Sequence, residues 1–313
     1  MLPNLLLLIL SIALILFGAD RLTEGASVVS RRMGVSEMVV GLTVVSFGTS
    51  MPEFVVSMTG ALTGASDISV GNIIGSNLFN ALVIVGCSAL ACPIAISNPT
   101  VRRDMPFALL STLLLVVLIS DTMLTDTQDN LLTRLDGFIL MLAFALFMLL
   151  MFVDKTDAEE TEMPTMPLWS ACLWIVVGLA CLVLGGELFV DNATALAREW
   201  GVSEMFIGLT IAAGGTSLPE LATSIVAARK GHSAMAIGNV VGSNVFNILF
   251  ILGACSLVSP LSVNSVSVVD IALLVFSMVA LWIFATSDLR ISRTEGLTLI
   301  LIYVGYVGYR IFI

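Results

Sequence analysis

The chain has 313 residues, of which 58% are hydrophobic and only 12% are charged, and its formal net charge is −10 at pH 7. Soluble domains are typically about half apolar and about a quarter charged, so this composition excludes an ordinary soluble globular protein. The negative charge does not define a general cation-attracting surface, because the segment 154–162 alone contributes five of the acidic residues.

Ten stretches of the chain are apolar and long enough to cross a membrane, which takes about 20 residues for a helix. They lie near residues 2–19, 36–62, 68–93, 104–121, 133–153, 168–190, 203–228, 233–258, 266–286 and 293–313. The first stretch could be a secretory signal peptide. However, it lacks a basic start and continues into Asp20, Arg21 and Glu24, which favours a retained helix. We therefore expect an all-α membrane protein with ten transmembrane helices.

The basic residues predict the orientation of these helices, because short cytoplasmic loops collect Lys and Arg. One side of the ten-helix layout carries nine of them, at positions 31, 32, 102, 103, 155, 229, 230, 290 and 293, and the other side carries three, at 134, 198 and 310. Both termini are thus predicted to lie outside the cell membrane. The acidic segment 154–167 is predicted to be a cytoplasmic hinge between the halves 1–153 and 168–313. A solvated linker is favoured there over a regulatory calcium site.

The two halves share an internal repeat with a constant offset of 167 residues. Residues 34–80 and 201–247 align without a gap and are identical at 24 of 47 positions. Each half holds five predicted spans, an odd number, so the second copy must cross the membrane in the opposite sense. Secondary transporters with such inverted repeats place their binding site where the two copies meet, near the midplane of the membrane.

The first strongly repeated motif is Gly48-Thr-Ser-Met-Pro-Glu53, whose copy ends at Glu220. Each glutamate falls in the middle of an apolar span, where an ionisable side chain indicates a functional site by default. The alternative is a structural glutamate that is protonated or paired with Arg, but neither span contains a basic residue. The duplication of the feature also favours a functional role.

A proline precedes each glutamate and predicts a kink in the helix. Pro52 has no N–H group, so the carbonyl of Gly48 loses its helical donor, and the copy repeats this arrangement. Backbone carbonyls that are free at membrane depth are tolerated where they line a cavity or bind a ligand. On helical spacing, Thr49, Ser50 and Glu53 also share one face, so hydroxyl, carbonyl and carboxylate oxygens would come together.

The second repeated motif is Gly71-Asn-Ile-Ile-Gly-Ser-Asn-Leu-Phe-Asn80, with a copy at 238–247. Its two glycines, four residues apart, permit close helix approach. Packing does not account for the polar residues, because amides in hydrocarbon need partners. Four neutral side chains are predicted to offer oxygens beside the glutamates, namely Ser76, Asn80, Ser243 and Asn247. For four others both a ligand role and a role in supporting broken-helix backbone remain open, namely Asn72, Asn77, Asn239 and Asn244.

The oxygen-rich composition of the two motifs predicts a hard cation as the ligand. Calcium takes roughly six to eight oxygen ligands, whereas softer metals prefer thiolate or imidazole. The five cysteines lie in apolar stretches without metal-ligand spacing, and the single histidine, His232, falls in a basic loop. Two carboxylates balance one divalent ion and could instead be neutralised by sodium ions or protons, which is typical of an antiporter. Paired buried carboxylates disfavour a channel, and the lack of a base near the kinked serines disfavours an intramembrane hydrolase.

The two motifs and their copies resemble the repeats of the calcium/cation antiporter superfamily, in particular the prokaryotic sodium/calcium exchangers, over essentially the whole chain. The resemblance implies two inverted five-helix repeats with broken helices 2, 3, 7 and 8, and sliding of the first and sixth helices to alternate access. It also implies that calcium is bound by Glu53, Glu220 and the carbonyls of Thr49 and Thr216. The implied sodium ligands are Ser46, Ser50, Ser76, Asn80, Ala213, Ser217, Ser243 and Asn247.

Two departures from related motifs bear on the coupled ion. Archaeal exchangers and potassium-dependent relatives have Asp where this chain has Asn247, so potassium coupling is not expected. Calcium/proton exchangers resemble Gly-Asn-x-x-Glu in the second motif, but Gly75 and Gly242 stand at the last position here. We therefore expect a transporter rather than an enzyme, exchanging calcium for sodium, with a calcium/proton antiporter as the alternative. The expected partners are membrane lipid and the two cations, without a cofactor or nucleic acid, and the oligomeric state is left open.

Overall fold

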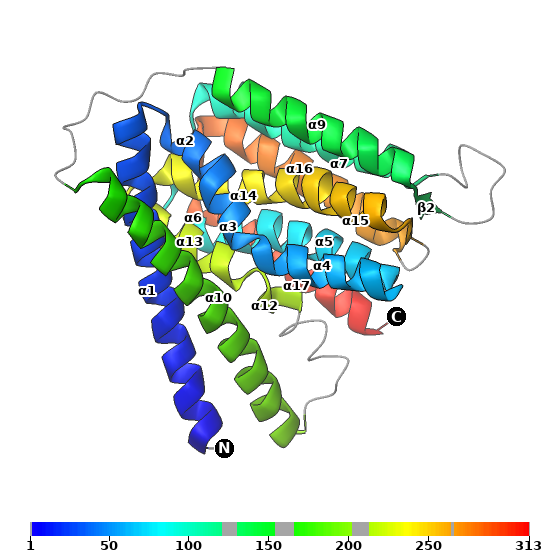
Figure 1. The fold of residues 1–313 in the computed structure, drawn as a ribbon, viewed down its shortest axis with the longest axis horizontal. Coiled ribbons are helices and arrows are strands. Elements are labelled where there is room, and N and C mark those ends of the chain that lie inside the picture. Colours follow the sequence, from blue (N-terminus) through cyan, green and yellow to red (C-terminus); the bar gives the residue numbers. More distant parts are fainter. Residues whose placement is uncertain (1, 121–129, 154–165, 202–212, 264–265, 313) are drawn as a thin grey trace.

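The computed structural model describes residues 2–120, 130–153, 166–201, 213–263 and 266–312 (Figure 1). In the first half the elements are α1 (Leu2–Met33), α2 (Glu37–Val40), η1 (Gly41–Val45), α3 (Ser46–Thr49), α4 (Met51–Thr63), α5 (Ser66–Phe79), η2 (Asn80–Ile84), α6 (Val85–Ala91), β1 (Ile94–Ala95), η3 (Thr100–Asp104), α7 (Met105–Leu118), β2 (Leu131–Leu132) and α9 (Arg134–Val153). The η elements are π-helical segments.

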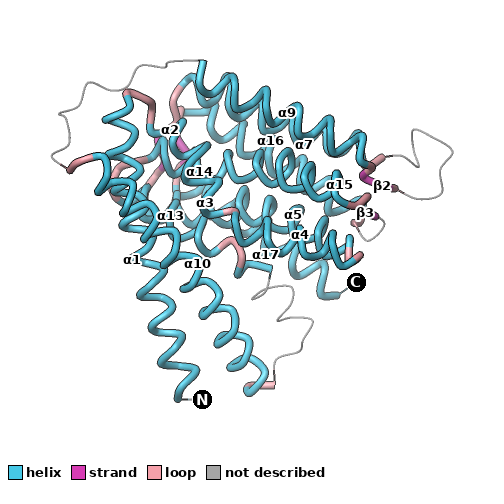
Figure 2. Tube along the Cα trace, viewed as in Figure 1, coloured by secondary structure: helices cyan, strands magenta, loops and turns pink. Residues whose placement is uncertain are grey.

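The second half repeats this order within the described residues. Its elements are α10 (Leu168–Glu199), α12 (Ala213–Gly215), α13 (Leu218–Arg229), α14 (Ser233–Val245), η5 (Phe246–Leu252), α15 (Gly253–Val258), β3 (Leu261–Ser262), α16 (Val268–Asp288), β4 (Arg290–Ile291) and α17 (Arg293–Phe312). Figure 2 shows that the described chain is almost entirely helical. Two short antiparallel ribbons, β1 with β4 and β2 with β3, each join one half to the other.

Repeated glycines explain where several of these helices end. Gly34 and Gly64 have φ angles of 65° and 77°, and their copies Gly201 and Gly231 have φ angles of 77° and 86°. A residue with a Cβ atom is strained in this left-handed region, whereas glycine adopts it freely and commonly terminates a helix. The repeat in the sequence is therefore also a repeat of backbone conformation.

Six helices of the described chain are long and apolar enough to cross a membrane, and a bent pair, Glu37–Thr49 with Met51–Thr63, makes a seventh. The predicted span 203–228 lies partly outside the described residues. Helices α7 and α17 occupy the predicted spans 104–121 and 293–313 but do not meet the same criteria of length and apolarity. The multi-pass helical architecture is confirmed, and the count of ten stays a prediction.

Two of the four predicted helix breaks are present. The second span bends by 50° between Thr49 and Met51, and two residues, Thr216 and Ser217, separate the end of α12 from the start of α13 at Leu218. The predicted breaks in the third and eighth helices were wrong, because residues 66–91 and 233–258 each form one continuous helix with a π-helical segment. Neither stretch contains proline, and a π-helical segment keeps backbone donors and acceptors paired.

The long helices α1 and α10 run antiparallel in close contact (Figure 1). A Cβ atom on Gly18 would lie 2.7 Å from the carbonyl oxygen of Gly178, and one on Gly185 would lie 3.1 Å from the backbone nitrogen of Ile15. Gly18 and Gly185 are 167 residues apart, so the repeat relates the two halves of this contact. The first helices of the two halves therefore cross the molecule in opposite senses, as an inverted repeat requires.

The centre of the molecule is formed by the two continuous helices that carry the second motif. In the most apolar window of residues 66–91 and of 233–258, 72% and 83% of positions are buried, against 22% in α1 and in α10. Burial on all sides suits a helix whose polar residues face other protein groups rather than lipid. The second motif thus lies at the interface of the two halves.

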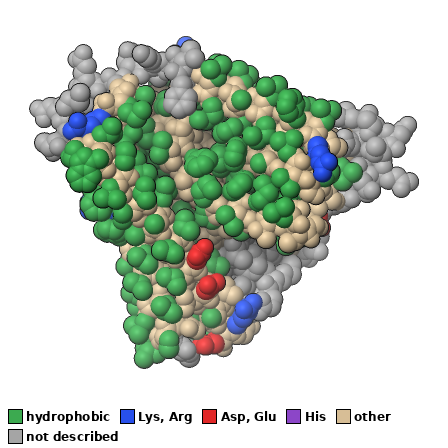
Figure 3. All heavy atoms as spheres, in the orientation of Figure 1, with side chains coloured by type: hydrophobic (Ala, Val, Ile, Leu, Met, Phe, Trp, Pro, Cys, Tyr) green, Lys and Arg blue, Asp and Glu red, His purple; other side chains and the backbone are tan. Residues whose placement is uncertain are grey.

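The outer surface of the helices is apolar. Large hydrophobic side chains are exposed along α1, α9 and α10, among them Leu6, Phe138, Leu142 and Leu173. Figure 3 shows hydrophobic side chains over most of the described surface on this face, with few charged groups. Soluble monomers rarely expose a continuous apolar surface of this kind, so it is suited to contact with lipid tails.

Candidate cation-binding site

The two glutamates predicted from the repeat meet at the centre of the molecule through reciprocal hydrogen bonds. Ser50 Oγ donates to Glu220 Oε1 over 2.8 Å, and Ser217 Oγ donates to Glu53 Oε1 over the same distance. Glu53 is 1% exposed and Glu220 is fully buried. Each carboxylate is thus held by a hydroxyl of the other repeat, and the site belongs to both halves.

The helix break explains this crossing of partners. Helical spacing predicted that Ser50 would share a face with Glu53, and the helix breaks at Ser50, whose hydroxyl donates to Glu220 of the other repeat. Its φ and ψ are −83° and 8°, and Ser217 has −90° and 9° in the equivalent break. Pro52 follows within the first turn of α4, a position where proline is common.

Neutral oxygens surround the carboxylates. Ser76 Oγ donates to Glu53 Oε1 over 3.4 Å, and Asn80 lies one turn further along the same buried helix. Four buried side-chain oxygens of predicted ligands have no hydrogen-bond partner among the described residues, namely Glu53 Oε2, Glu220 Oε2, Asn80 Oδ1 and Asn247 Oδ1. Buried oxygens without donors are costly unless a cation binds them, so this donor set fits a hard metal ion.

Neutral ligands dominate this set. In the part of the chain that the structure describes, no three His, Cys, Asp or Glu side chains are grouped so that they could hold a metal ion. A structural zinc or redox-metal centre is therefore not indicated by these residues. Two carboxylates with neutral oxygens match calcium, and weaker neutral coordination also suits sodium.

Asn72 and Asn239 support the backbone beside the glutamates, one of the two roles that the sequence left open. Asn72 Nδ2 donates to the carbonyl oxygen of Glu53 over 3.2 Å and to Ser57 Oγ over 3.0 Å. Asn239 Nδ2 makes the equivalent hydrogen bond to the carbonyl oxygen of Glu220 over 3.3 Å. These asparagines hold the first turns of α4 and α13 in place through their NH₂ groups, and Asn239 Oδ1 in addition accepts from Thr49 Oγ1.

Thr49 and Ser46, which were predicted to bind cations through backbone carbonyls, lie close to these asparagines. Thr49 Oγ1 lies 3.2 Å from Asn239 Oδ1, and Ser46 Oγ donates to the carbonyl oxygen of Leu42 over 2.7 Å. Both hydroxyls are used within the protein, and the carbonyl oxygen of Ser46 accepts from the backbone N–H of Ser50 over 3.0 Å. Ala213 begins α12, and its side chain lies outside what the structure describes.

The glycines of the second motif bring the site helices together. A Cβ atom on Gly242 would lie 2.6 Å from Leu42 Cα and 2.7 Å from Ser46 Oγ, and one on Gly238 would lie 2.8 Å from the carbonyl oxygen of Met38. The predicted close approach is therefore confirmed for α14 against the helix formed by α2, η1 and α3. The segment that the repeat would place against Gly71 lies outside the described residues.

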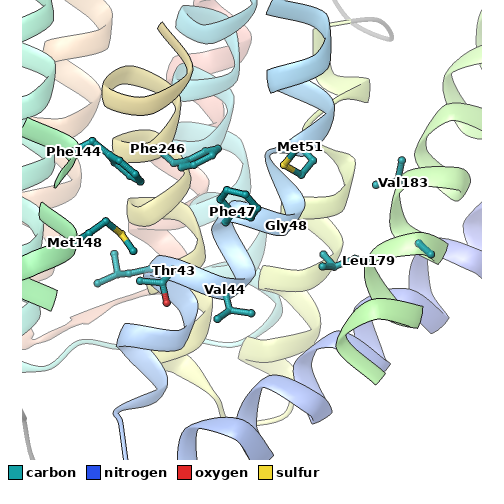
Figure 4. A pocket seen from close by; sticks show the side chains of 12 residues that line it. Thr43, Val44, Phe47, Gly48, Met51, Phe144, Met148, Leu179, Val183 and Phe246 are labelled. Atoms are coloured by element: carbon teal, nitrogen blue, oxygen red, sulfur yellow. The ribbon is translucent and has the colours of Figure 1, made fainter. Parts of the chain in front are cut away.

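An apolar cavity of about 670 Å³ lies beside the helix break and was not predicted from the sequence. Figure 4 shows Phe47, Gly48 and Met51 at the break, with Leu179 and Val183 of α10 on one side and side chains of α9 on another. The full lining is Leu42, Thr43, Val44, Phe47, Gly48, Met51, Phe144, Met148, Leu179, Ala180, Val183 and Phe246. No charged side chain lines this cavity, so it is not the cation site.

The reciprocal serines provide a test of the two-fold geometry. Ser50→Ala and Ser217→Ala each remove one hydroxyl from a carboxylate, and a hydrogen bond to a charged group contributes about 1.5–3 kcal/mol. We expect each change to lower cation affinity about tenfold or more, and by similar factors, when binding is measured calorimetrically. Ser277→Ala is the control, because Ser277 is buried but bonds within α16. Unchanged affinity in both serine variants would contradict this geometry.

A helical membrane protein in which two repeats enclose buried carboxylates and neutral oxygens is a membrane cation transporter. A model of the family described as "Sodium/calcium exchanger protein" matches residues 3–153 and 170–312, and the chain belongs to this family. The family is one of transporters rather than enzymes, which agrees with the prediction from the sequence.

Named relatives and solved structures match along most of the chain. It is 36% identical to the inner membrane protein YrbG of Escherichia coli (strain K12), over 81% of this chain and 79% of that one. It is 31% identical to the sodium/calcium exchanger MaX1 of Methanosarcina acetivorans, over 97% of both chains. A solved structure of the sodium-calcium exchanger NCX_Mj, soaked with Na⁺ and Sr²⁺, superposes with a TM-score of 0.85 at 30% identity, over 97% of both chains. The recognition of a prokaryotic exchanger-like protein is confirmed.

Proposed function

We propose that this protein exchanges calcium for sodium across the membrane by alternating access to one buried site. The observation that carries the proposal is the reciprocal pairing of Ser50 with Glu220 and of Ser217 with Glu53 between the two repeats. It brings two carboxylates, enough to balance one divalent ion, into a setting of neutral oxygens. The similarity to the sodium/calcium exchanger MaX1 and to NCX_Mj supports the choice of ions.

The proposed ligands follow from the positions of the oxygens. Calcium is bound by the carboxylates of Glu53 and Glu220 and by the carbonyls of Thr49 and Thr216. Sodium ions are bound at overlapping and flanking positions by oxygens of Ser46, Ser50, Ser76, Asn80, Ala213, Ser217, Ser243 and Asn247. The antiparallel helices α1 and α10 move against the central helices to expose the site to each side in turn.

Calcium/proton exchange is the second candidate, because the same glutamates could take up protons in place of sodium. Glycine at positions 75 and 242 favours sodium, since neither position carries the additional carboxylate of the proton-exchanger motif, and at Gly242 the backbone of Leu42 leaves no room for one. Calcium uptake into proteoliposomes should therefore follow an imposed sodium gradient and should fail with a proton gradient alone. Uptake driven by protons without sodium would favour the second candidate.

We further propose that the protein lies in the cell membrane with both termini outside and with the segment 154–167 in the cytoplasm. Tags at either terminus should react with an impermeant reagent in intact cells, because ten spans return the chain to its starting side. A cysteine introduced in the segment 154–167 should react after permeabilisation alone. A terminal tag that is protected until permeabilisation would contradict the ten-helix topology.

A further inference from the structure

Four buried asparagines form a closed network where the two repeats meet. Asn77 Nδ2 donates to the carbonyl oxygen of Asn244 over 3.1 Å, and Asn244 Nδ2 donates to the carbonyl oxygen of Asn77 over 3.5 Å. Asn247 Nδ2 donates to Asn77 Oδ1 over 2.9 Å, and Asn80 Nδ2 donates to Asn244 Oδ1 over 3.1 Å. All four side chains are nearly or completely buried, so these contacts are not shared with solvent.

The backbone fixes the orientation of every amide in this network. A carbonyl oxygen is an acceptor only, so the group of Asn77 that meets the backbone of Asn244 must be the NH₂ group. The other end of Asn77 is then an oxygen, and the group of Asn247 that meets it must again be NH₂. Equivalent logic runs from Asn244 to Asn80, and the thioether of Met278, 3.4 Å from Asn244 Nδ2, is a further acceptor at that end.

In this orientation Asn80 and Asn247 can offer only oxygen atoms to the cation-binding site. With their NH₂ groups engaged, Asn80 and Asn247 have only Oδ1 left, and neither oxygen has a partner among the described residues. Asn80 follows Ser76 by one helical turn, on the side of the helix where Ser76 bonds Glu53. An amide in the opposite orientation would present hydrogens with partial positive charge to a cation and would repel it.

We propose that Asn77 and Asn244 are positioning residues, which orient the amides of Asn247 and Asn80 so that oxygen faces the transported cation. The inference rests on the proposed function, because it concerns how the same site recognises calcium and sodium. It assigns the two inner asparagines a role beyond the hydrogen bonds that each donates to the backbone of the opposite repeat. It also accounts for a neutral residue at position 247, because a carboxylate there would place two acceptors, its own oxygen and Asn77 Oδ1, in contact.

A double-mutant cycle separates orientation from packing. Asn77→Leu frees the amide of Asn247 to rotate, so calcium affinity measured by titration calorimetry should fall about tenfold or more. In the Asn247→Asp background the two carboxylate oxygens are equivalent, so rotation of this side chain does not change which atom faces the cation. Asn77 Oδ1 then lies against a carboxylate oxygen and repels it. There, Asn77→Leu should leave affinity unchanged or increase it. An equal loss in both backgrounds would overturn the inference, since a packing defect does not depend on which atoms residue 247 carries.

The repeat supplies a matched control within the same network. Asn244→Leu acts on Asn80, so Asn247→Asp should not rescue it, whereas Asn80→Asp should. Wild-type affinity in both leucine variants would also overturn the inference. If Asn77→Leu fails to fold, Asn77→Ala takes its place with the same predicted cycle, and melting temperatures report the packing effect separately. A wild-type protein that binds no calcium would instead overturn the proposed function.

Discussion

Glu53→Gln is expected to abolish calcium transport, and Glu220→Gln is expected to do the same. Each change removes one of two charges facing a divalent ion while keeping the size of the side chain and an oxygen that can accept from the opposing serine. At an effective dielectric constant near 20, two unit charges 4 Å apart interact with about 4 kcal/mol, so the loss of one charge facing a divalent ion should lower affinity at least about a thousandfold. Calcium binding and uptake into proteoliposomes are the measurements.

The surface residue Asp288 provides a control for the loss of charge. Asp288→Asn removes the same charge from an exposed carboxylate whose nearest basic partner is 3.7 Å away, and an exposed pair of this kind contributes little. Its uptake should equal that of the wild type. Normal uptake in either glutamine variant would show that the two carboxylates do not share one calcium ion.

Gly242→Ala is expected to abolish exchange by separating the helices that form the site. The added Cβ atom would lie 2.6 Å from Leu42 Cα and 2.7 Å from both Leu42 O and Ser46 Oγ, so backbone would have to move. Overpacking of this kind costs about 1–3 kcal/mol, and the displacement would also pull Thr49 away from Asn239. The measurements are the melting temperature in detergent and sodium-driven calcium uptake.

Gly253 lies further along the same continuous helix and gives a matched control. A Cβ atom there would lie 3.1 Å from the flexible side chain of Met141 and 3.3 Å from the carbonyl oxygen of Gly137 and from Leu140 Cβ, so a shift of a few tenths of an ångström is enough to accommodate it. Gly253→Ala should retain most of the uptake and a nearly unchanged melting temperature. A Gly242→Ala variant that transports as well as Gly253→Ala would mean that the close contact of α14 with η1 is not needed.

The repeat allowed the fold and the central carboxylates to be predicted from the sequence. Glu53 and Glu220 stand out because both are ionisable residues in apolar spans and both are duplicated at one offset. The close contact at Gly242 was also predictable, since small residues four apart mark a helix interface. These are local or periodic properties, which a sequence records directly.

The partners of the polar side chains could not be predicted, because they depend on how the two copies dock. Ser50 was predicted to share a face with Glu53, and that spacing did not reveal that its hydroxyl donates to Glu220 of the other repeat. Asn72 and Asn77 are chemically identical and five residues apart in one motif, yet one bonds the backbone near Glu53 and the other bonds the opposite repeat. Spacing alone does not distinguish such roles. The predicted hinge falls largely at residues 154–165, outside the described residues.

The central claim is that calcium leaves the site to one side only when another cation takes its place. Calcium-loaded proteoliposomes diluted into a medium without sodium or calcium test it most directly. A site with two buried carboxylates and no bound cation is not expected to switch its access from one side of the membrane to the other. We predict that calcium is retained in this medium and released when sodium is added outside. Rapid release into the sodium-free medium, at the same rate as after sodium addition, would contradict an exchanger and indicate a channel or uniporter.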